Sequence, residues 1–353
     1  MNAKTLKSLK LSNHKLRRCR MNSLKCALLA SAVTLAGLTT SAAWTVNDAS
    51  NPTRITSEDG MILKVEVVSS SDKTLRISGV ETLNDKTVLD LTSGVEQGWK
   101  VVAFKSYYDA YRYFESIVSV RAPLVETVGS YVFQASTTLQ DVYFPSCTNI
   151  SQQAFHNCQA LTNAVFSSNL AAVGKSAFYS DKALVSFSPM TLTRLTSLGS
   201  QAFAMCSKLR GEWILDSPAI TTLPYGVFWT NRAVTNFVFR KSAVTTLEDL
   251  ALFTVAQDGG SVYFYHAAPT LGGGSAIYST GKRLRIYAPN LAENKEWQEL
   301  MAKNKDYFDN HKTDADYPGS KTVGMIKMTS DNFYSWVISW SPSAAAGLML
   351  IIR

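Results

Sequence analysis

Two consecutive stretches of the sequence decide the fold: VGKSAFYSDKALVSFSP at Val173–Pro189 and LGSQAFAMCSKLRGEWIL at Leu198–Leu215. In both, an aliphatic residue lies five positions before a phenylalanine, and a leucine lies six positions after it. The same pattern can be followed through residues 117–255, less regularly in the last row, where Leu247 lies six positions before the phenylalanine. The aligned residues are Phe133, Phe155, Phe178, Phe203, Phe228 and Phe253, with spacings of 22, 23, 25, 25 and 25 residues.

A repeat of this length cannot bury its own apolar side chains, so successive coils must stack and share one core. Apolar and polar residues alternate after each aligned leucine, which predicts a half-buried strand. Its apolar residues are Val142, Phe144, Val165, Val185, Phe187, Ile214, Phe237 and Phe239. The glycines before the first, third and fourth phenylalanines indicate a positive φ or a close backbone approach, and the Ala-Phe step predicts a helical or 3₁₀ turn. The expected fold is a β-dominated α/β solenoid of the leucine-rich-repeat type.

The rows resemble the BspA-like leucine-rich repeats, whose pattern is roughly I-G-x-x-A-F-x-x-C-x-x-L-x-x-V-x-x-P. The fourth row matches best, with Leu198-Gly199, Ala202-Phe203 and Cys206, whereas the last two rows lack both the glycine and the cysteine. The resemblance covers residues 117–255. It implies a bacterial protein that is secreted or held at the cell surface and adheres to host proteins or to other cells.

The position three residues after each phenylalanine predicts a buried slot for small or polar side chains. Cys158 and Cys206 occupy this slot two coils apart, a separation of about 10 Å that is beyond disulfide reach. A bond between Cys147 and Cys158 stays open at this point. Three cysteines after residue 43 do not make a disulfide framework.

The first 43 residues have the features of a secretory signal peptide. Basic residues precede the apolar run Cys26–Leu38, and Ser41 and Ala43 fit the cleavage-site positions, which predicts processing after Ala43. Met21 is a possible true start. The apolar run is too short to span a bilayer comfortably, so we expect a secreted or cell-surface protein without an integral membrane span.

The positive net charge of +8 belongs to this leader. Residues 1–43 contain eight basic residues and no acidic one, so 35 − 8 = 27 basic residues face 27 acidic residues in the remainder. A formally neutral chain has no global field directed at phosphates. This argues against a nucleic-acid partner and disfavours anionic partners in general.

The repeats need flanking segments that cover the ends of the array. Alternating stretches predict a β-rich N-terminal cap, and one amphipathic helix is expected over 291–308 in the C-terminal cap. The apolar end Ala344–Arg353 is either a last strand or a sorting signal. The expected domains are a leader at 1–43, an N-terminal cap at 44–116, about six repeat coils at 117–255, a C-terminal cap at 256–312 and a tail at 313–353.

No sequence motif indicates a catalytic, cofactor-binding or metal-binding site. One cluster suggests ligand binding, because tyrosines with an arginine are typical of interface hot spots. The alternative is a seam that seals the N-terminal cap against the first coil. The cluster comprises Tyr107, Tyr108, Tyr111, Arg112 and Tyr113.

Three functions are compatible with these features. The first is a binding or adhesion module for an extracellular protein or glycan. The second is a structural envelope protein without a specific ligand, and the third is an exported enzyme with its site in a cap. The rows and leader favour the first, and the sequence does not indicate the ligand or the oligomeric state.

Overall fold

The fold was obtained as a computed structural model. Its contacts divide the chain into Met1–Ser41 and Ala42–Arg353, and all described residues belong to the second unit. For Tyr278 and for residues 284–287, 323–326 and 335–338, only the backbone is described. The described residues are 43–107, 114–240, 244–253, 255, 260–265, 269–272, 276–278, 284–287, 295, 323–326 and 335–338.

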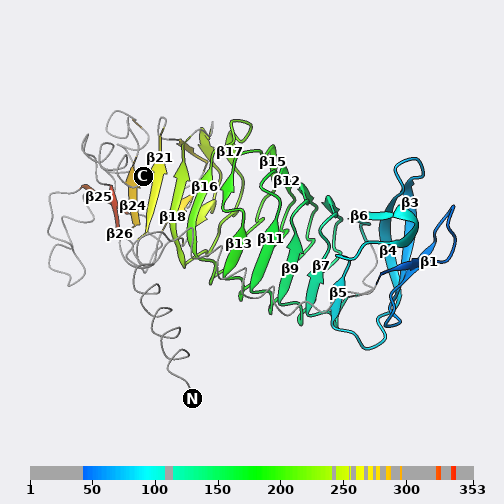
Figure 1. Ribbon diagram of the computed structural model, residues 1–353. Coiled ribbons are helices and arrows are strands. Elements are labelled where there is room, and N and C mark those ends of the chain that lie inside the picture. Colours follow the sequence, from blue (N-terminus) through cyan, green and yellow to red (C-terminus); the bar gives the residue numbers. More distant parts are fainter. Residues whose placement is uncertain are drawn as a thin grey trace, which may run out of the picture. The chain divides into compact units, whose positions relative to one another are not determined.

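An antiparallel segment begins the described fold and passes into a parallel stack (Figure 1). Four strands pair antiparallel, and the fourth pairs in parallel with the first strand of the stack. These strands form one nine-stranded sheet. Its members in spatial order are β1 (Thr45–Val46), β2 (Arg54–Thr56), β3 (Ile62–Ser69), β4 (Thr74–Thr82), β6 (Lys100–Phe104), β8 (Thr127–Val128), β10 (Asn149–Ile150), β12 (Ala172–Val173) and β15 (Ser197–Leu198).

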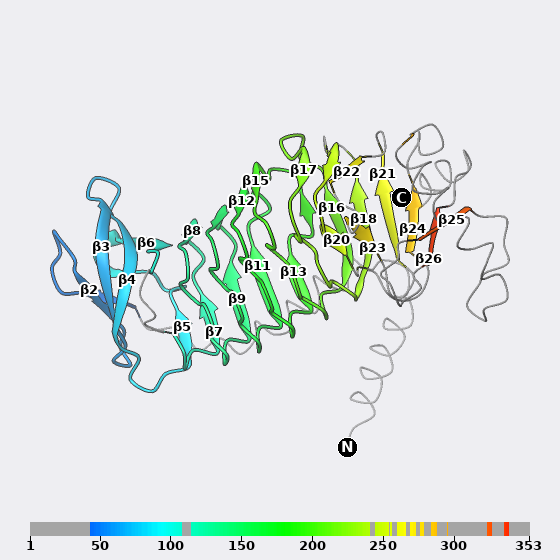
Figure 2. The ribbon, with the colours of Figure 1, turned by 180° about the vertical axis from the view of Figure 1, so that it is seen from behind.

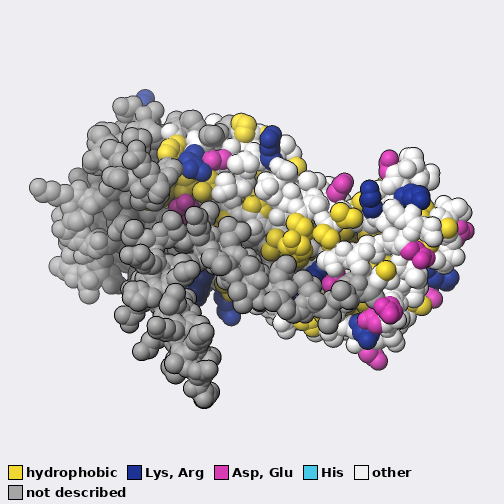
Figure 3. Space-filling view, in the orientation of Figure 1, with side chains coloured by type: hydrophobic (Ala, Val, Ile, Leu, Met, Phe, Trp, Pro, Cys, Tyr) yellow, Lys and Arg dark blue, Asp and Glu magenta, His cyan; other side chains and the backbone are white. Residues whose placement is uncertain are grey.

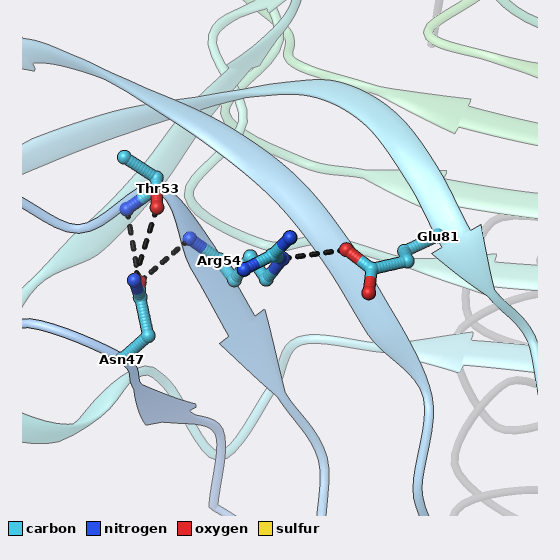
Figure 4. Close-up of polar contacts among 4 residues, drawn as sticks. All are labelled: Asn47, Thr53, Arg54 and Glu81. Carbon is cyan, nitrogen blue, oxygen red and sulfur yellow. Dashed lines mark hydrogen bonds and ion pairs between the residues drawn. The ribbon is translucent and has the colours of Figure 1, made fainter.

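Polar contacts hold the loop between β1 and β2 (Figure 4). The Oδ1 atom of Asn47 accepts hydrogen bonds from the backbone N–H groups of Thr53 (3.0 Å) and Arg54 (2.8 Å). The guanidinium of Arg54 in turn pairs with Glu81 on β4 at 2.5 Å. The side chains therefore fix the first hairpin to the sheet.

The other side of each coil carries a second strand. Early coils contribute β5 (Val88–Asp90), β7 (Ser119–Arg121), β9 (Asp141–Phe144), β11 (Asn163–Phe166) and β13 (Ser186–Ser188), which lie side by side in a parallel sheet (Figure 1). Later coils contribute a seven-stranded sheet. Its order is β14 (Thr191–Leu192), β16 (Gly211–Leu215), β18 (Val234–Phe239), β21 (Ser261–Phe264), β24 (Leu284–Tyr287), β26 (Ser335–Ile338) and β25 (Val323–Ile326).

Short strands complete the later coils, as seen from behind in Figure 2. A 3₁₀ turn, η3, spans Glu96–Gly98. The parallel pairing thus runs from β5 to β24, on both sides of the expected 117–255 array. The short strands are β17 (Thr222–Leu223), β19 (Thr246–Leu247) and β22 (Thr270–Leu271) in one sheet, and β20 (Leu252–Phe253) with β23 (Ile277–Tyr278) in another.

Consecutive β-turns, rather than the expected helical or 3₁₀ turn, connect the two strands of a coil. In the second repeat, Ala154 N–H bonds to Ser151 O and Cys158 N–H bonds to Phe155 O, each over three residues. The residues two before and two after each of the first five aligned phenylalanines have positive φ, as at Gln153 (52°) and Asn157 (64°). A right-handed helix cannot pass through such residues.

Backbone hydrogen bonds join these turns from coil to coil. Three N–H groups of each turn donate to carbonyls of the next coil; Phe155 N–H, for example, donates to Ala177 O at 2.8 Å. We call these bonds the turn ladder. They satisfy the backbone of a non-helical segment and offset the cost of positive φ at non-glycine residues, about 1 kcal/mol each.

Two columns of aromatic rings fill the core. The aligned phenylalanines stack face to face, with centroids 5.1 Å apart and planes 6° apart between Phe155 and Phe178. Rings from the second strand form the other column and meet the first edge-on, as Phe187 does with Phe178 at 84°. Edge-to-face and stacked pairs are both favourable for aromatic quadrupoles, so the columns lock each coil to its neighbours.

The turn ladder shows that Leu252, not Phe253, occupies the sixth aligned position. Phe228 N–H donates to Ala251 O, just as Phe203 N–H donates to Val227 O, and Leu247 pairs with Leu223. Leu247 therefore lies five residues before the aligned residue, as in every other row. Leu252 is fully buried and Phe253 only partly, so burial agrees with the pairing.

Close backbone approach explains the repeated glycine. A Cβ atom on Gly199 would lie 2.3 Å from the backbone N of Lys175, and one on Gly174 would lie 2.5 Å from the backbone N of Gln152. Neither glycine has a positive φ. Elsewhere this position holds Ser151, so the requirement belongs to particular pairs of coils.

Parts of the C-terminal expectations lie outside the described residues. This holds for the amphipathic helix at 291–308, apart from Lys295, and for Ala344–Arg353. The expected signal peptide at 1–43 also lies outside them, apart from Ala43. Within the described part of the chain, no helix is long and apolar enough to cross a membrane.

Candidate binding face

The outward side of the five-stranded sheet is the candidate site, and we call it the strand face. Parallel sheets in proteins are usually covered on both sides. Here the inward side chains, such as Val142 and Phe144, are buried in the core, while the outward residues between them are exposed or half-buried. Nothing in the described part of the second unit adds a layer over this sheet (Figure 1).

Strand register places one column of outward residues along this face. Asp90 pairs with Arg121, Arg121 with Tyr143, Tyr143 with Val165, and Val165 with Ser188. Tyr143, in the centre, is 45% exposed. The column therefore combines a cation, an aromatic ring and a β-branched side chain within about 10 Å along the stack.

Exposed apolar side chains concentrate on and beside this sheet. Figure 3 shows hydrophobic side chains gathered over its middle. Single exposed apolar residues are ordinary on protein surfaces, whereas a group of them on one face indicates an interaction surface. Of the six most exposed large hydrophobic residues in the described chain, four lie here: Val88, Leu124, Tyr143 and Val185.

The alternation pattern predicted the inward side of the strands only in part. Of its apolar residues, Val142, Phe144, Phe187, Phe237 and Phe239 are buried in the core. Val165, Val185 and Ile214 instead lie on the outward side, and Phe166 and Trp213 enter the core beside Val165 and Ile214. Counting from the aligned phenylalanine separates the two sides in the second and third rows but not in the fourth, where the register shift between Gly211 and Glu212 turns Trp213 inward. A one-residue difference in register exchanges the inward and outward side chains.

On the later sheet, polar side chains pair across coils. The amide of Asn236 donates to Glu212 at 3.0 Å, and Arg240 pairs with the buried carboxylate of Asp216 at 3.1 Å. Tyr265 adjoins this group, and burial raises its pKa while Arg240 opposes that shift. Arg240 thus balances the charge of Asp216, whereas Glu212 is hydrogen-bonded to a neutral amide and keeps its negative charge.

The tyrosine cluster is only partly described. Tyr107 is half-buried and packs against the core, and its backbone N–H donates to Ser130 O at 2.9 Å. This position suits the seam between cap and first coil. Its other members, Tyr108, Tyr111, Arg112 and Tyr113, lie outside the described residues.

The slot three residues after each aligned position is buried, as its small and polar residues indicated. Asp181 Oδ1 accepts a hydrogen bond from Cys158 N–H at 2.7 Å, and burial raises the pKa of this carboxyl well above its usual range. The thiols of Cys158 and Cys206 donate to backbone carbonyls of earlier coils at 3.0 and 3.1 Å.

All three described cysteines are free and buried. No disulfide joins Cys147 and Cys158. Burial raises the pKa of Cys147 to about 12 and raises those of Cys158 and Cys206 as well, so the thiols stay protonated and inert. The described residues hold no group of three or more His, Cys, Asp or Glu side chains placed to bind a metal ion.

Stacked parallel strands, an aligned aliphatic and aromatic core, and a repeat of 22 to 25 residues define a leucine-rich-repeat solenoid. The family model described as the BspA type leucine-rich repeat region matches residues 126–254 in six copies. This part of the chain is therefore a BspA-type leucine-rich repeat array.

Similar solved structures include three bacterial leucine-rich-repeat proteins. That from T. pallidum is 24% identical, with 51% of this chain and 82% of that chain covered and a TM-score of 0.43. One from Bacteroides ovatus is 16% identical, with 64% and 70% covered and a TM-score of 0.40. A leucine rich cell surface protein from Faecalibacterium prausnitzii is 14% identical, with 71% and 98% covered and a TM-score of 0.30. No curated protein sequence matches the chain.

Proposed function

We propose that this chain is an exported binding module, not an enzyme, and that the strand face takes up a protein ligand outside the cell. The observation that carries the proposal is a parallel sheet, with Tyr143 at its centre, over which no described residue forms a further layer. Tyrosine and arginine are among the residues enriched in interface hot spots. The rigid stack of coils holds these side chains in place before a ligand arrives, which lowers the entropic cost of binding.

Export is supported by the leader-like sequence of residues 1–43 and by the position at which the fold begins. Trp44, the first residue after the expected cleavage site, is buried, and its indole N–H donates to Asp90 O at 2.8 Å. Cleavage after Ala43 would leave every described strand intact. We propose a secreted or cell-surface location on these grounds.

A matched pair of tyrosine substitutions tests the strand face. Tyr143→Ala removes the central ring, and Tyr225→Ala removes a ring of similar exposure, 41% against 45%, at the start of a turn. Binding of purified extracellular-matrix proteins would be measured by surface plasmon resonance. We expect Tyr143→Ala to raise the Kd about tenfold or more, or at least about 1.4 kcal/mol, and Tyr225→Ala to leave it unchanged.

Two results would contradict the proposal. Equal affinities of the two variants would show that the strand face is not the ligand site. Absence of binding to every matrix protein, with the protein abundant in isolated envelopes, would support the structural role instead. Thermal unfolding of both variants checks that a loss of binding is not a loss of folding.

A further inference from the structure

The middle coils carry an uneven distribution of charge. Residues 142–211 contain five basic residues and a single acidic one, Asp181. The five basic residues are exposed, whereas Asp181 is fully buried inside the slot. Burial raises the pKa of this carboxyl, which favours its neutral form, and the side chain has no exposed surface. The chain after residue 43 is therefore formally neutral as a whole, while the surface of these coils carries positive charge.

Four exposed basic residues lie at the same corner of three consecutive coils. Lys182 and Arg232 lie four residues after their aligned phenylalanines, and Lys208 and Arg210 lie five and seven residues after theirs. The corner is where the turn leads into the second strand. Backbone pairing confirms that the coils are adjacent there, since Arg210 N–H donates to Val185 O and Gly211 pairs with Val234. We call these four residues the basic corner.

Within the described part of the chain, none of the four forms an ion pair. Of the acids that follow in sequence, Asp216 is paired with Arg240, and Glu212 accepts a hydrogen bond from the amide of Asn236 on the next coil. Successive coils are about 4.8 Å apart, so the basic corner extends on the order of 10 Å along the stack. This is close to the Debye length of about 8 Å at physiological salt, so the charges act together on a ligand.

We propose that the basic corner binds an anionic polysaccharide, with the polymer running along the stack and its acidic groups meeting successive cations. Leu184 and Leu209 are buried, and apart from Val185 the exposed or half-buried residues next to the cations in sequence are small or polar, including Ala183, Ser207 and Ala233. A protein partner needs an apolar centre to bury, and the corner offers little. A hydrated polymer of hydroxyl and acidic groups needs only charge and hydrogen-bonding side chains.

The proposal is tested on the full chain with two double variants of equal charge change. Lys182→Gln with Lys208→Gln removes half of the basic corner, and Lys64→Gln with Lys100→Gln removes two exposed lysines of the N-terminal segment. The probes are dextran sulfate, polygalacturonate and uncharged dextran, with poly-glutamate and duplex DNA as other polyanions. The affinity is measured at several salt concentrations.

We expect the protein to bind dextran sulfate, polygalacturonate or both, and to show no affinity for uncharged dextran. The corner variant should lose about tenfold in affinity at 0.15 M salt, and the slope of log K against log[salt] should fall by about two, one for each lost contact. The control variant should keep both values. Comparison of the two acidic polymers tells whether sulfate or carboxylate groups are preferred.

The proposal is overturned if both variants lose affinity equally, or if no acidic polysaccharide binds. It is also overturned if poly-glutamate or DNA binds as tightly as the polysaccharides, because the corner would then be a general polyanion surface. Since Tyr143 is not among the altered residues, failure here leaves the strand-face proposal standing, and the reverse is equally true.

Discussion

Replacing Gly199 by alanine adds one methyl group at the tightest approach between two coils. The new Cβ atom would lie 2.3 Å from Lys175 N and 2.5 Å from Gly174 C. Both are backbone atoms, which cannot move aside as the end of a flexible side chain can. The substitution therefore has to separate the third and fourth coils of the repeat array.

The structure indicates how large the cost is. Ordinary contact begins at 3.4 Å, so the coils must move apart by 3.4 − 2.3 = 1.1 Å. Gly199 N–H donates to Val173 O at 2.8 Å, and Ser176 N–H donates to Ser200 O at 2.9 Å. A shift of this size takes both bonds beyond about 3.5 Å, where little attraction is left. Two bonds at about 1 kcal/mol each and overpacking of about 1–3 kcal/mol predict a loss of about 3–5 kcal/mol.

Urea denaturation followed by tryptophan fluorescence measures this loss, and Gly79→Ala is the matched control. A Cβ atom on Gly79 meets nothing closer than Lys64 Cδ at 3.5 Å. This variant should unfold within about 1 kcal/mol of the wild type, because the unfolded chain also loses freedom. A Gly199→Ala protein as stable as Gly79→Ala would refute the close-approach explanation of the repeated glycine.

Three further outcomes are expected. Asp181→Asn should be more stable than the wild type at pH 7 and should lose this advantage near pH 4. The reason is that the raised folded-state pKa of Asp181 contributes stability to the wild type only at low pH, and that contribution fades as the pH rises. A difference in the free energy of unfolding that stays constant between pH 4 and 8 would contradict the raised pKa. Leu252→Ala should lower the free energy of unfolding, measured by urea denaturation, by about 2–5 kcal/mol, and Phe253→Ala should lower it clearly less. The opposite order would show that Phe253, not Leu252, is the aligned core residue of the sixth coil. Ellman's reagent should find no reactive thiol in the folded exported protein and three in guanidinium, whereas five would show that the leader is retained.

The spacing of the phenylalanines was sufficient to predict the stacked coils, because a fixed repeat with a fixed apolar pattern has few other solutions. The turns could not be predicted in the same way. Residues such as Asn157 and Tyr131 take up positive φ only because neighbouring coils supply the hydrogen bonds of the turn ladder. Local propensity favours a helical turn there, and tertiary contacts override it.

The sixth coil and the strand face show a second limit of prediction from the sequence, which is the register of each strand. Matching letters aligned Phe253 with the other phenylalanines, whereas the backbone register selects Leu252, a smaller side chain that still fills the core. The same uncertainty of one residue affected Val165 and Ile214, which lie on the outward side of their strands. Local alternation cannot tell which apolar residue enters the core when both sides of a strand carry apolar side chains.

The turn ladder has a mechanical consequence for a protein exposed at a cell surface. Its hydrogen bonds and those of the strands all point along the stack, so a pull on the chain end loads the bonds of the outermost coil first. Coils would then detach one after another, each at a similar force, instead of the whole array failing at once. In the cell-surface role that we propose, each released coil would lengthen the chain and refold on the coil beneath it, so the array would withstand repeated pulling.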